Sequence, residues 1–339
     1  MRKLLFLVLY IFAFISLTCD KKNITEPSLQ IDLDSLEVNW CWIPAGPFTF
    51  GNPSATLSNP LDYWIMQYEV TNYMYVDFLN HMWAEDLIFI KDETDLIYGY
   101  DGYVVNPQTQ ELQAQGNEVL FYRMGDPNEQ YFNAVINWIP DRFQFDIAVP
   151  INFAQMKNHL YQSPVTNVTW WGAWAFALRY GWRLPTEYEW ECAARANTGY
   201  NYPWGNDIDS SNANYTSSKD PFSEGVTPVG FYNGQTNSGL MDTYNFQTTD
   251  SKSPSFNNLP YPLSGGVYDM AGNVWEWCDS WISPGVLNKV KRGGSWYGCQ
   301  QLDLRSWLRN QGNPEYCFGD LGFRCVSDKT PPGQMNETW

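Results

Sequence analysis

The chain has 339 residues, of which 44% are hydrophobic, 17% aromatic and 17% charged, and its formal net charge is −17. This acidity argues against nucleic acid and anionic membrane surfaces as partners, because both require a basic surface. The only two histidines, His81 and His159, argue against a multi-histidine iron, zinc or copper site. The 17 Trp and 22 Tyr predict short strands and loops held by aromatic side chains, in preference to a helical bundle.

The amino terminus has the composition of a targeting segment. Arg2 and Lys3 precede an apolar run over 4–17, which is too short to span a membrane permanently. The run ends before Cys19 in a context that resembles the lipobox of bacterial lipoproteins, although Ser16 stands where an aliphatic residue is usual. We expect residues 1–18 to be a signal peptide, Cys19 to be lipidated and 19–35 to be a tether. The protein is then an exported cell-envelope lipoprotein on the outer membrane or cell surface; the alternative is plain secretion or release into the periplasm.

Export also determines how the other cysteines are interpreted. Apart from Cys19 the chain contains an even number of them, namely Cys41, Cys192, Cys278, Cys299, Cys317 and Cys325. An even number outside the cytosol favours disulfides, but spacing does not define their connectivity. The absence of any CxxC pair excludes a zinc ribbon.

The first predicted elements are strands followed by a helix. Residues 38–43 alternate like a strand, 44–46 turn and 48–51 return, which predicts a β-hairpin. A further strand is expected at 63–66. Thr71 is placed to cap a helix that runs to Trp83, with apolar residues at helical spacing.

The middle of the chain contains a loosely patterned insertion and two helices. Residues 84–162 combine short aromatic strands with polar turns, and because no linker bounds them we expect an elaboration of the same domain. Thr169 caps an apolar helix that ends at Gly181. Thr186 and Glu189 form a capping box at the start of a helix that extends to about Ala196.

The last third is rich in turns, and one stretch in it is unusual. Asp269 and Glu276 lie seven residues apart with small residues between them, and Trp275 and Trp277 flank Glu276. A loop with free carbonyls and a carboxylate at each end can wrap a hard cation. The alternative is a glycine turn followed by a half-buried strand with a solvated glutamate. Strands are expected near Val290 and at 321–325, and 330–339 is expected to be a polar tail.

Eight collinear stretches resemble the formylglycine-generating enzyme family, also called the sulfatase-modifying-factor family. They are 42–46 (WIPAG), 68–72 (YEVTN), 164–170 (PVTNVTW), 183–191 (RLPTEYEWE), 202–206 (YPWGN), 272–277 (GNVWEW), 292–296 (RGGSW) and 322–325 (GFRC). The resemblance implies one compact α+β domain over 36–329, of the C-type-lectin-like kind. Such a domain has short strands, few helices and much irregular chain.

The resemblance also implies two structural calcium sites. One would use the side chains and carbonyls of Asp269, Gly272, Val274 and Glu276. The other would use side-chain oxygens of Asn214 and Asp220 with the carbonyls of Tyr215 and Phe222. Both sets consist of hard oxygen donors, as calcium requires.

The catalytic site that the resemblance implies is incomplete. Family enzymes hold copper(I) with two cysteines that follow the Gly-Gly-Ser motif and are separated by four residues; thiolates suit this soft ion. Cys299 lies one residue late for the first position, and Leu304 stands five residues beyond it. The resemblance places Ser295, Trp296 and Asp320 in the substrate groove, where family enzymes carry an asparagine in place of Asp320. Cys299 would be the catalytic residue if the chain is active; the structural alternative is a disulfide of Cys299 with Cys317, and Cys192 and Cys325 are further disulfide candidates.

Two functions follow from these observations. The favoured one is an exported, lipid-anchored, non-catalytic member of the family that binds a protein or glycan at the cell envelope and uses calcium structurally. The alternative is a divergent oxidase that converts a substrate cysteine to formylglycine with copper and O2. A histidine-dependent iron oxygenase or a Ser-His-Asp hydrolase is disfavoured because His81 and His159 are too few and lie in no recognisable motif.

Overall fold

A computed structural model describes residues 38–91, 96–105, 112–124, 135–147, 157–218, 220–222, 225–234, 236–238, 245–247, 250, 252 and 266–331. The predicted signal peptide, Cys19 and the tether lie outside the described residues, as does most of the predicted tail. Residues 37–339 cluster as one compact unit. Among the described residues, no helix has both the length and the apolar composition needed to span a bilayer.

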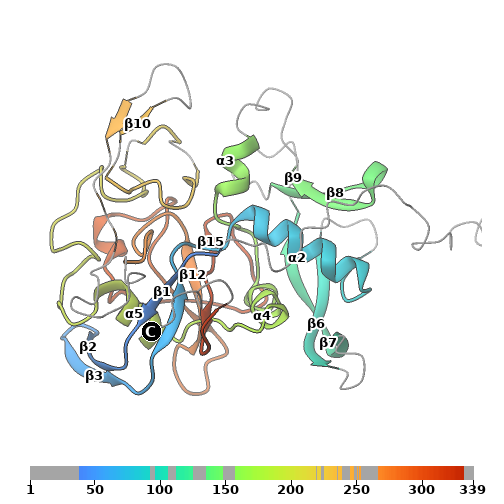
Figure 1. The fold of residues 1–339 in the computed structure, drawn as a ribbon, viewed down its shortest axis with the longest axis horizontal. Coiled ribbons are helices and arrows are strands. Elements are labelled where there is room, and N and C mark those ends of the chain that lie inside the picture. The colour runs from blue at the N-terminus through green and yellow to red at the C-terminus, as the bar shows by residue number, and fades with distance from the viewer. Residues whose placement is uncertain are drawn as a thin grey trace, which may run out of the picture. The chain divides into compact units, whose positions relative to one another are not determined.

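One antiparallel sheet joins the first and the last strands of the domain. In it β4 (Tyr63–Met66) lies between β1 (Trp40–Ile43, labelled in Figure 1) and β16 (Val326–Ser327). The predicted pairing of 38–43 with 48–51 is wrong, because β2 (Gly46–Phe50) pairs instead with β3 (Ala55–Asn59). The hydrogen-bonded neighbour of β1 is the fully buried β4, with Trp42 opposite Trp64, whereas β2 is only half-buried.

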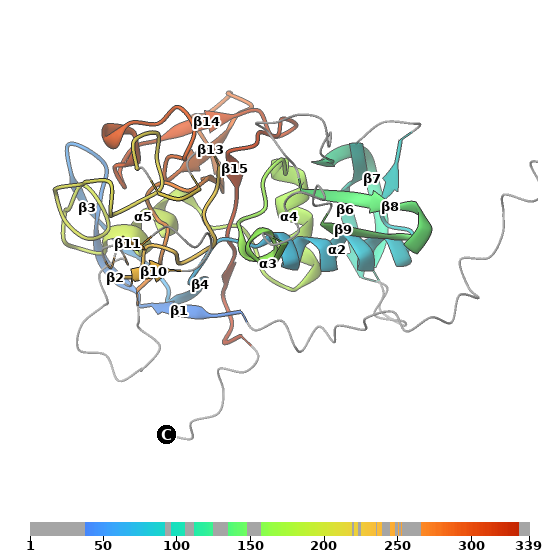
Figure 2. The same cartoon turned by 90° about the horizontal axis from the view of Figure 1, so that it is seen from above.

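A second sheet carries the tryptophan-rich stretch. Its strand order is β14 (Asn310–Gly312), β13 (Lys289–Arg292), β12 (Trp275–Trp281) and β15 (Leu321–Gly322), with β12 and β15 parallel (Figure 2). The strand predicted near Val290 is therefore confirmed. The stretch after Gly272 is a strand, but its glutamate is fully buried and not solvated.

The predicted helix starts are confirmed by their caps. Thr71 Oγ1 accepts a hydrogen bond from Met74 N at the start of α2 (Asn72–Ala84), and Thr169 Oγ1 accepts one from Gly172 N before α4 (Trp170–Arg179). Thr186 and Glu189 form the reciprocal capping box of α5 (Glu187–Arg195). Each cap satisfies amides that the first turn of a helix leaves without partners.

The described parts of the insertion at 84–162 form a separate small sheet and a hairpin. The strands β5 (Phe89–Ile90), β6 (Leu96–Val105) and β7 (Leu112–Arg123) pair in that order. A 3₁₀ turn, η2 (Pro140–Arg142), joins β8 (Ile136–Ile139) to β9 (Gln144–Ile147), and α3 (Lys157–Gln162) follows. Thr169 donates a hydrogen bond from its hydroxyl to Leu120 O, which joins α4 to β7. The remaining short elements are β10 (Thr236–Ser238), β11 (Asn245–Gln247) and η4 (Gln301–Leu304).

The core is aromatic, as the composition predicts. Tyr75 and Phe78 of α2 pack against Phe176 of α4 and Phe323, with ring centroids 5.2–6.2 Å apart. A second buried cluster lies between β1, β4 and α5 and contains Ile65, Trp190 and three thiols. Short strands, few helices and much irregular chain confirm the predicted α+β fold class.

Candidate functional site

The predicted substrate-groove residues come together between two loops. Ser295 is fully buried, and its hydroxyl donates to Asp320 Oδ2 at 2.8 Å. Trp296 Nε1 donates to Gly319 O at 3.4 Å, so residues 295–296 lie against 319–320. Burial raises the pKa of the Asp320 carboxyl above its ordinary value, while its bond from Ser295 and the charge of Lys291 act in the opposite direction.

Cys299 adjoins this pair but is not activated. Its sulfur lies 3.6 Å from Ser295 Oγ, and its side chain is 6% exposed. Burial raises the pKa of the thiol above its ordinary value; hydrogen bonds with Ser295 oppose this rise, and the charges of Asp303 and Asp320 add to it. The thiolate is the form that binds metals and attacks electrophiles, so this environment disfavours both reactions at neutral pH.

The position of the second copper ligand is occupied by a packed aliphatic side chain. Leu304 ends η4 and is fully buried in the larger core cluster. A Cβ built on Gly294 would lie 3.1 Å from Leu304 Cδ1, which shows how tightly this side chain is enclosed. The residues present therefore do not fit a two-cysteine copper(I) site. Within the described part of the chain, no three His, Cys, Asp or Glu side chains are grouped so as to hold a metal ion.

The predicted disulfides are not formed. No disulfide joins any two of the six cysteines that the structure describes, and all but Cys317 are buried. Cys192 and Cys325 belong to different core clusters. Cys299 faces Ser295, whereas Cys317 lies beside Arg123. These thiols act as small apolar side chains in the core, a role that their even number did not reveal.

Glu276 does not have the free oxygens that the resemblance implies. Arg324 donates to it twice, from Nε to Oε2 at 2.7 Å and from Nη2 to Oε1 at 2.8 Å. Trp190 Nε1 adds a third bond to Oε2 at 2.9 Å. Both Glu276 and Arg324 are fully buried. Three donors therefore already contact the two oxygens of Glu276, and its role as a calcium ligand stays a prediction.

Asp269, at the other end of the same loop, has a different environment. Its Oδ2 accepts a hydrogen bond from Gly230 N at 2.6 Å. Burial raises the pKa of Asp269 to about 6. Val274 is fully buried, and Gly272 has a φ of +83° with no room for a Cβ, which would lie 2.3 Å from Asn214 O. The loop is therefore pressed directly onto the 212–232 segment.

Glu69 is a carboxylate that the sequence did not single out at this site. It is 1% exposed, and Oε1 accepts from Asn273 Nδ2 at 3.1 Å. No N–H or hydroxyl group in the described part of the chain donates to its Oε2, and a side-chain hydrogen bond with Glu69 lowers the pKa of the neighbouring Asp269. Burial and then the charge of Asp269 raise the pKa of Glu69 well above its usual range. The sequence feature that could have identified Glu69 is its place between the buried strand β4 and Thr71, the N-cap of α2.

Asn273 links these carboxylates to the groove. Its side-chain Oδ1 accepts from Thr227 N at 3.0 Å, while its Nδ2 bonds Glu69. Its backbone N donates to Asn214 O at 2.8 Å, and its backbone O accepts from Trp296 N at 2.9 Å. One residue therefore contacts the acidic cluster, the 212–232 loop and the groove.

The second predicted calcium set lies in that loop, but its carboxylate is occupied by local donors. Asp220 Oδ1 accepts from Phe222 N at 2.8 Å, and Oδ2 accepts from Ser218 Oγ at 2.6 Å and Tyr232 OH at 3.1 Å. Tyr215 O accepts from Ser218 N, and Asn214 Nδ2 donates to Gly225 O. Of the four predicted ligands, the Asp220 carboxylate and the Tyr215 carbonyl already accept hydrogen bonds from within this loop.

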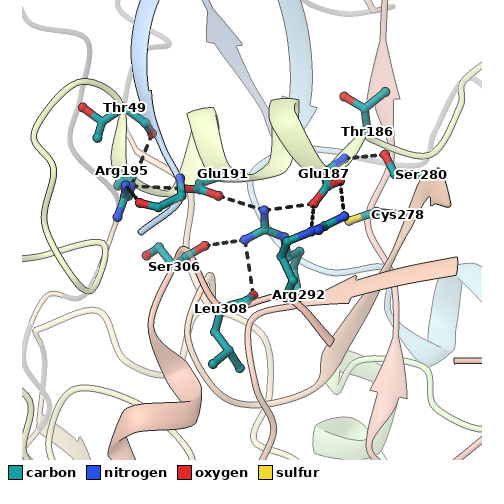
Figure 3. A network of polar contacts seen from close by, with 12 residues as sticks. Thr49, Thr186, Glu187, Glu191, Arg195, Cys278, Ser280, Arg292, Ser306 and Leu308 are labelled. Carbon is teal, nitrogen blue, oxygen red and sulfur yellow. Dashed lines mark hydrogen bonds and ion pairs between the residues drawn. The ribbon is translucent and has the colours of Figure 1, made fainter. Parts of the chain in front are cut away.

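A second buried ionic cluster, also missed from the sequence, joins α5 to β13 (Figure 3). Arg292 donates from Nη2 to Glu191 at 2.8 Å and to Glu187 at 3.3 Å, and from Nη1 to the carbonyl of Ser306 at 2.9 Å. Arg195 lies 3.2 Å from Glu191, and Glu191 also accepts from Gly51 N. The cluster connects the start of the domain to its last sheet.

Three exposed aromatic side chains are close in sequence to the predicted groove residues. Tyr297 is 53% exposed, Phe318 46% and Tyr316 57%. Next to Phe318 is a cavity of about 450 Å³, whose walls come from the insertion strands and from the 315–318 segment; it is lined by Leu96, Leu120, Arg123, Glu315, Tyr316, Cys317 and Phe318. The insertion therefore contributes one wall of a hollow beside the predicted groove.

The fold and these motifs define a formylglycine-generating-enzyme-like domain. The family model of the sulfatase-modifying factor enzyme 1-like domain matches residues 35–329, and the chain belongs to this family. Formylglycine-generating enzymes of the family use calcium and copper.

The relatives include proteins with both active and inactive names. The chain is 34% identical over 234 residues to the inactive C-alpha-formylglycine-generating enzyme 2 of Mus musculus, covering 66% of this chain and 68% of that one. It is 32% identical over 184 residues to the formylglycine-generating enzyme of Streptomyces coelicolor, covering 49% and 52%. It is 32% identical over 224 residues to the serine/threonine-protein kinase Pkn1 of Chlamydia trachomatis, covering 60% of this chain but only 30% of that relative.

Proposed function

We propose that this protein is a non-catalytic binding or assembly member of the formylglycine-generating enzyme family. The observation that carries the proposal is Leu304, a packed side chain where a second thiolate is required. One buried thiol with a raised pKa does not supply the ligand pair that copper(I) needs. In this proposal the chain has the fold of the family but does not carry out its copper-dependent oxidation.

We propose that the partner binds at the predicted groove. Tyr297, Tyr316 and Phe318 expose aromatic rings around the buried Ser295–Asp320 pair and beside the cavity. Aromatic rings with a polar edge suit contacts with peptides and glycans, and they often dominate binding energy. The partner we propose is a protein or glycan at the cell envelope.

The proposed location follows from the amino-terminal pattern. A lipid on Cys19 would tether the domain to the outer membrane or cell surface and hold the groove close to envelope partners. Mass spectrometry of the mature protein tests this directly. The expected result is a diacylated or triacylated peptide that begins at Cys19; an unmodified amino terminus elsewhere in the first 40 residues contradicts it.

The absence of catalysis is tested with copper(I), O2 and a cysteine-containing peptide. We expect no copper-dependent oxygen consumption, and the same background from Cys299→Ser. The alternative, a divergent oxidase, is supported by the position of Cys299 next to Ser295 and Asp320. Copper-dependent turnover that disappears in Cys299→Ser would overturn the proposal in favour of that oxidase.

Binding is tested by changing the aromatic rim. The full-length protein is screened against envelope glycans and peptides, and the double variant Tyr297→Ala/Phe318→Ala is expected to weaken the strongest interaction at least about tenfold. Tyr188→Ala is the matched control, because Tyr188 is 47% exposed on α5 and lies outside the groove loops. Equal loss in the control and in the rim variant would show that the rim is not the binding face.

We further propose that calcium is a structural ion of this chain. Asp269 is the side chain of the first predicted set that is not held by an arginine in the described contacts. The second predicted calcium site, at Asn214 and Asp220, remains a prediction. The ion would stabilise the irregular loops around the groove and take no part in a reaction.

A further inference from the structure

We infer that the cavity between the insertion strands and the 315–318 segment is an anchor site for an acidic peptide of a partner protein. One apolar side chain of the peptide lies in the cavity, and its carboxylates contact Arg123 and Lys291. The inference rests on the proposal that the groove is a binding face, and it adds the chemistry of the partner. It favours a peptide over a glycan as the ligand.

The two walls of the cavity are joined by backbone hydrogen bonds. Arg123 N, at the end of β7, donates to Asn167 O at 3.1 Å, and Asn167 N donates to Phe318 O at 2.9 Å. Beside these bonds, the hydroxyl of Thr169 donates to Leu120 O. The cavity is therefore formed before a ligand binds, and a ligand does not bear the cost of ordering its walls.

The lining of the cavity suits an apolar side chain. Leu96, Leu120, Cys317 and Phe318 supply apolar surface, and the volume is about 450 Å³. Ligand pockets have volumes of roughly 300–1,000 Å³ and are mostly apolar, with a few polar groups that orient the ligand. A sugar ring would place hydroxyls against apolar atoms without hydrogen bonds, which is unfavourable. An aliphatic or aromatic side chain of a peptide has no such cost.

Two cations adjoin Phe318 and form no ion pair with any residue that the structure describes. Arg123 lines the cavity together with Phe318. Lys291 Nζ lies 5.2 Å from the centre of the Trp275 ring and 5.7 Å from the centre of the Phe318 ring, within reach of a cation–π interaction. A cation–π contact does not supply acceptors for the N–H donors of an ammonium group. Both cations can therefore bond the carboxylates of a ligand.

Two acids lie near these cations, and neither replaces a ligand. Asp320 Oδ2 accepts the hydrogen bond of the Ser295 hydroxyl at 2.8 Å, and Glu315 is exposed at the cavity. Burial lowers the pKa of Lys291, and the charge of Asp320 opposes this change without restoring the ordinary value. A bound carboxylate would stabilise the ammonium, whereas a cationic ligand would destabilise it. Glu315 would repel an acidic peptide, so its removal tests the sign of the preference.

The experiment uses the mature full-length protein and an immobilised library of blocked random decapeptides. We expect the bound peptides to be enriched in Asp or Glu next to an aliphatic or aromatic residue. Fluorescence anisotropy then measures the affinity of the best-bound peptide. Arg123→Gln and Lys291→Gln should each weaken it at least about fivefold, because each removes a charge-assisted hydrogen bond. Glu315→Gln should strengthen it about twofold, because it removes a like charge.

Cys317 supplies a second readout, which locates the peptide. It lines the cavity, and the other five cysteines that the structure describes are buried. N-ethylmaleimide should therefore label Cys317 first, and slowly, because burial raises the pKa of its thiol to about 11. The peptide should slow this labelling in proportion to the fraction of protein bound, as mass spectrometry measures. Leu96→Trp fills part of the cavity and should abolish binding and protection; its melting temperature checks that it folds.

The matched control is Arg142→Gln, because Arg142 is an exposed arginine of the insertion that does not line the cavity. Equal weakening by Arg142→Gln and Arg123→Gln would overturn the inference, as would enrichment of neutral or basic peptides. If oligouronates bind in place of peptides and lose affinity in Tyr297→Ala/Phe318→Ala, the binding face stands and the acidic peptide does not. If neither peptides nor glycans bind, the binding proposal and this inference both fail.

Discussion

The domain contains two buried clusters of arginine and carboxylate side chains, and they differ in how their charge is balanced. In the cluster of Figure 3, Glu187 and Glu191 contact Arg292, Arg195 and Arg309. In the other cluster, three carboxylates share Arg324. The first cluster has at least one arginine for each carboxylate, whereas the second has three carboxylates for one arginine.

The difference indicates separate roles. A buried ion pair contributes little net stability compared with apolar packing, but removing one partner is costly because it leaves an unpaired buried charge. The Arg292 cluster can therefore function as a protein-only connection between α5 and β13. The Arg324 cluster requires a further cation or a proton. Substitutions in the two clusters should separate these roles.

The largest expected effect is that of Arg324→Met. It removes the guanidinium that bonds both oxygens of Glu276 and leaves three buried carboxylates together. We expect a loss of about 5 kcal/mol in the free energy of unfolding, measured with urea. Calcium should recover part of the loss. A loss below about 1 kcal/mol would show that the carboxylates are already neutral.

Arg292→Met should have the next largest effect, about 3 kcal/mol by the same measurement. It is smaller because Arg195 still faces Glu191 and Arg309 still bonds Glu187. Calcium should not change the loss, in contrast to Arg324→Met. Arg309→Met is the control: this side chain is 39% exposed, and its loss should stay near 1 kcal/mol. If calcium changed the loss of unfolding free energy in Arg292→Met, the two clusters would not differ in their need for a cation.

The smallest effect is expected at the exposed ion pair of Arg183 and Asp328, which serves as a reference for the two buried clusters. Arg183 bonds Asp328 at 2.6 Å, and this bond lowers the pKa of Asp328. A lowered carboxyl pKa adds stability above the unfolded value of about 3.9 and loses it as the pH falls below that value. Asp328→Asn should therefore cost at most about 1 kcal/mol at pH 7 and progressively less as the pH falls through the lowered pKa of Asp328 in the folded protein. Urea unfolding at pH 7 and at about pH 3 measures it, and an equal cost at both pH values would contradict the ion-pair explanation.

Features governed by local sequence could be predicted, and those governed by distant contacts could not. The caps at Thr71, Thr169 and Thr186 depend on three or four neighbouring residues, and all three are confirmed. The partner of β1 is β4, beyond the nearer β2, so the hairpin prediction failed.

The predicted site residues show the same division between features set by local sequence and features set by distant contacts. Ser295, Trp296 and Asp320 come together as the resemblance implies. Glu69 was missed because only the folded chain places it against Asp269. The disulfide prediction came from the number of cysteines and the compartment, which say nothing about whether two thiols meet in the core.

The position of β4 between β1 and β16 also bears on how this domain can be used in larger proteins. The strands that open and close the domain lie on either side of one central strand, roughly 10 Å apart at the usual spacing. A domain whose entry and exit points are this close can be inserted into a host polypeptide with little disturbance of either partner.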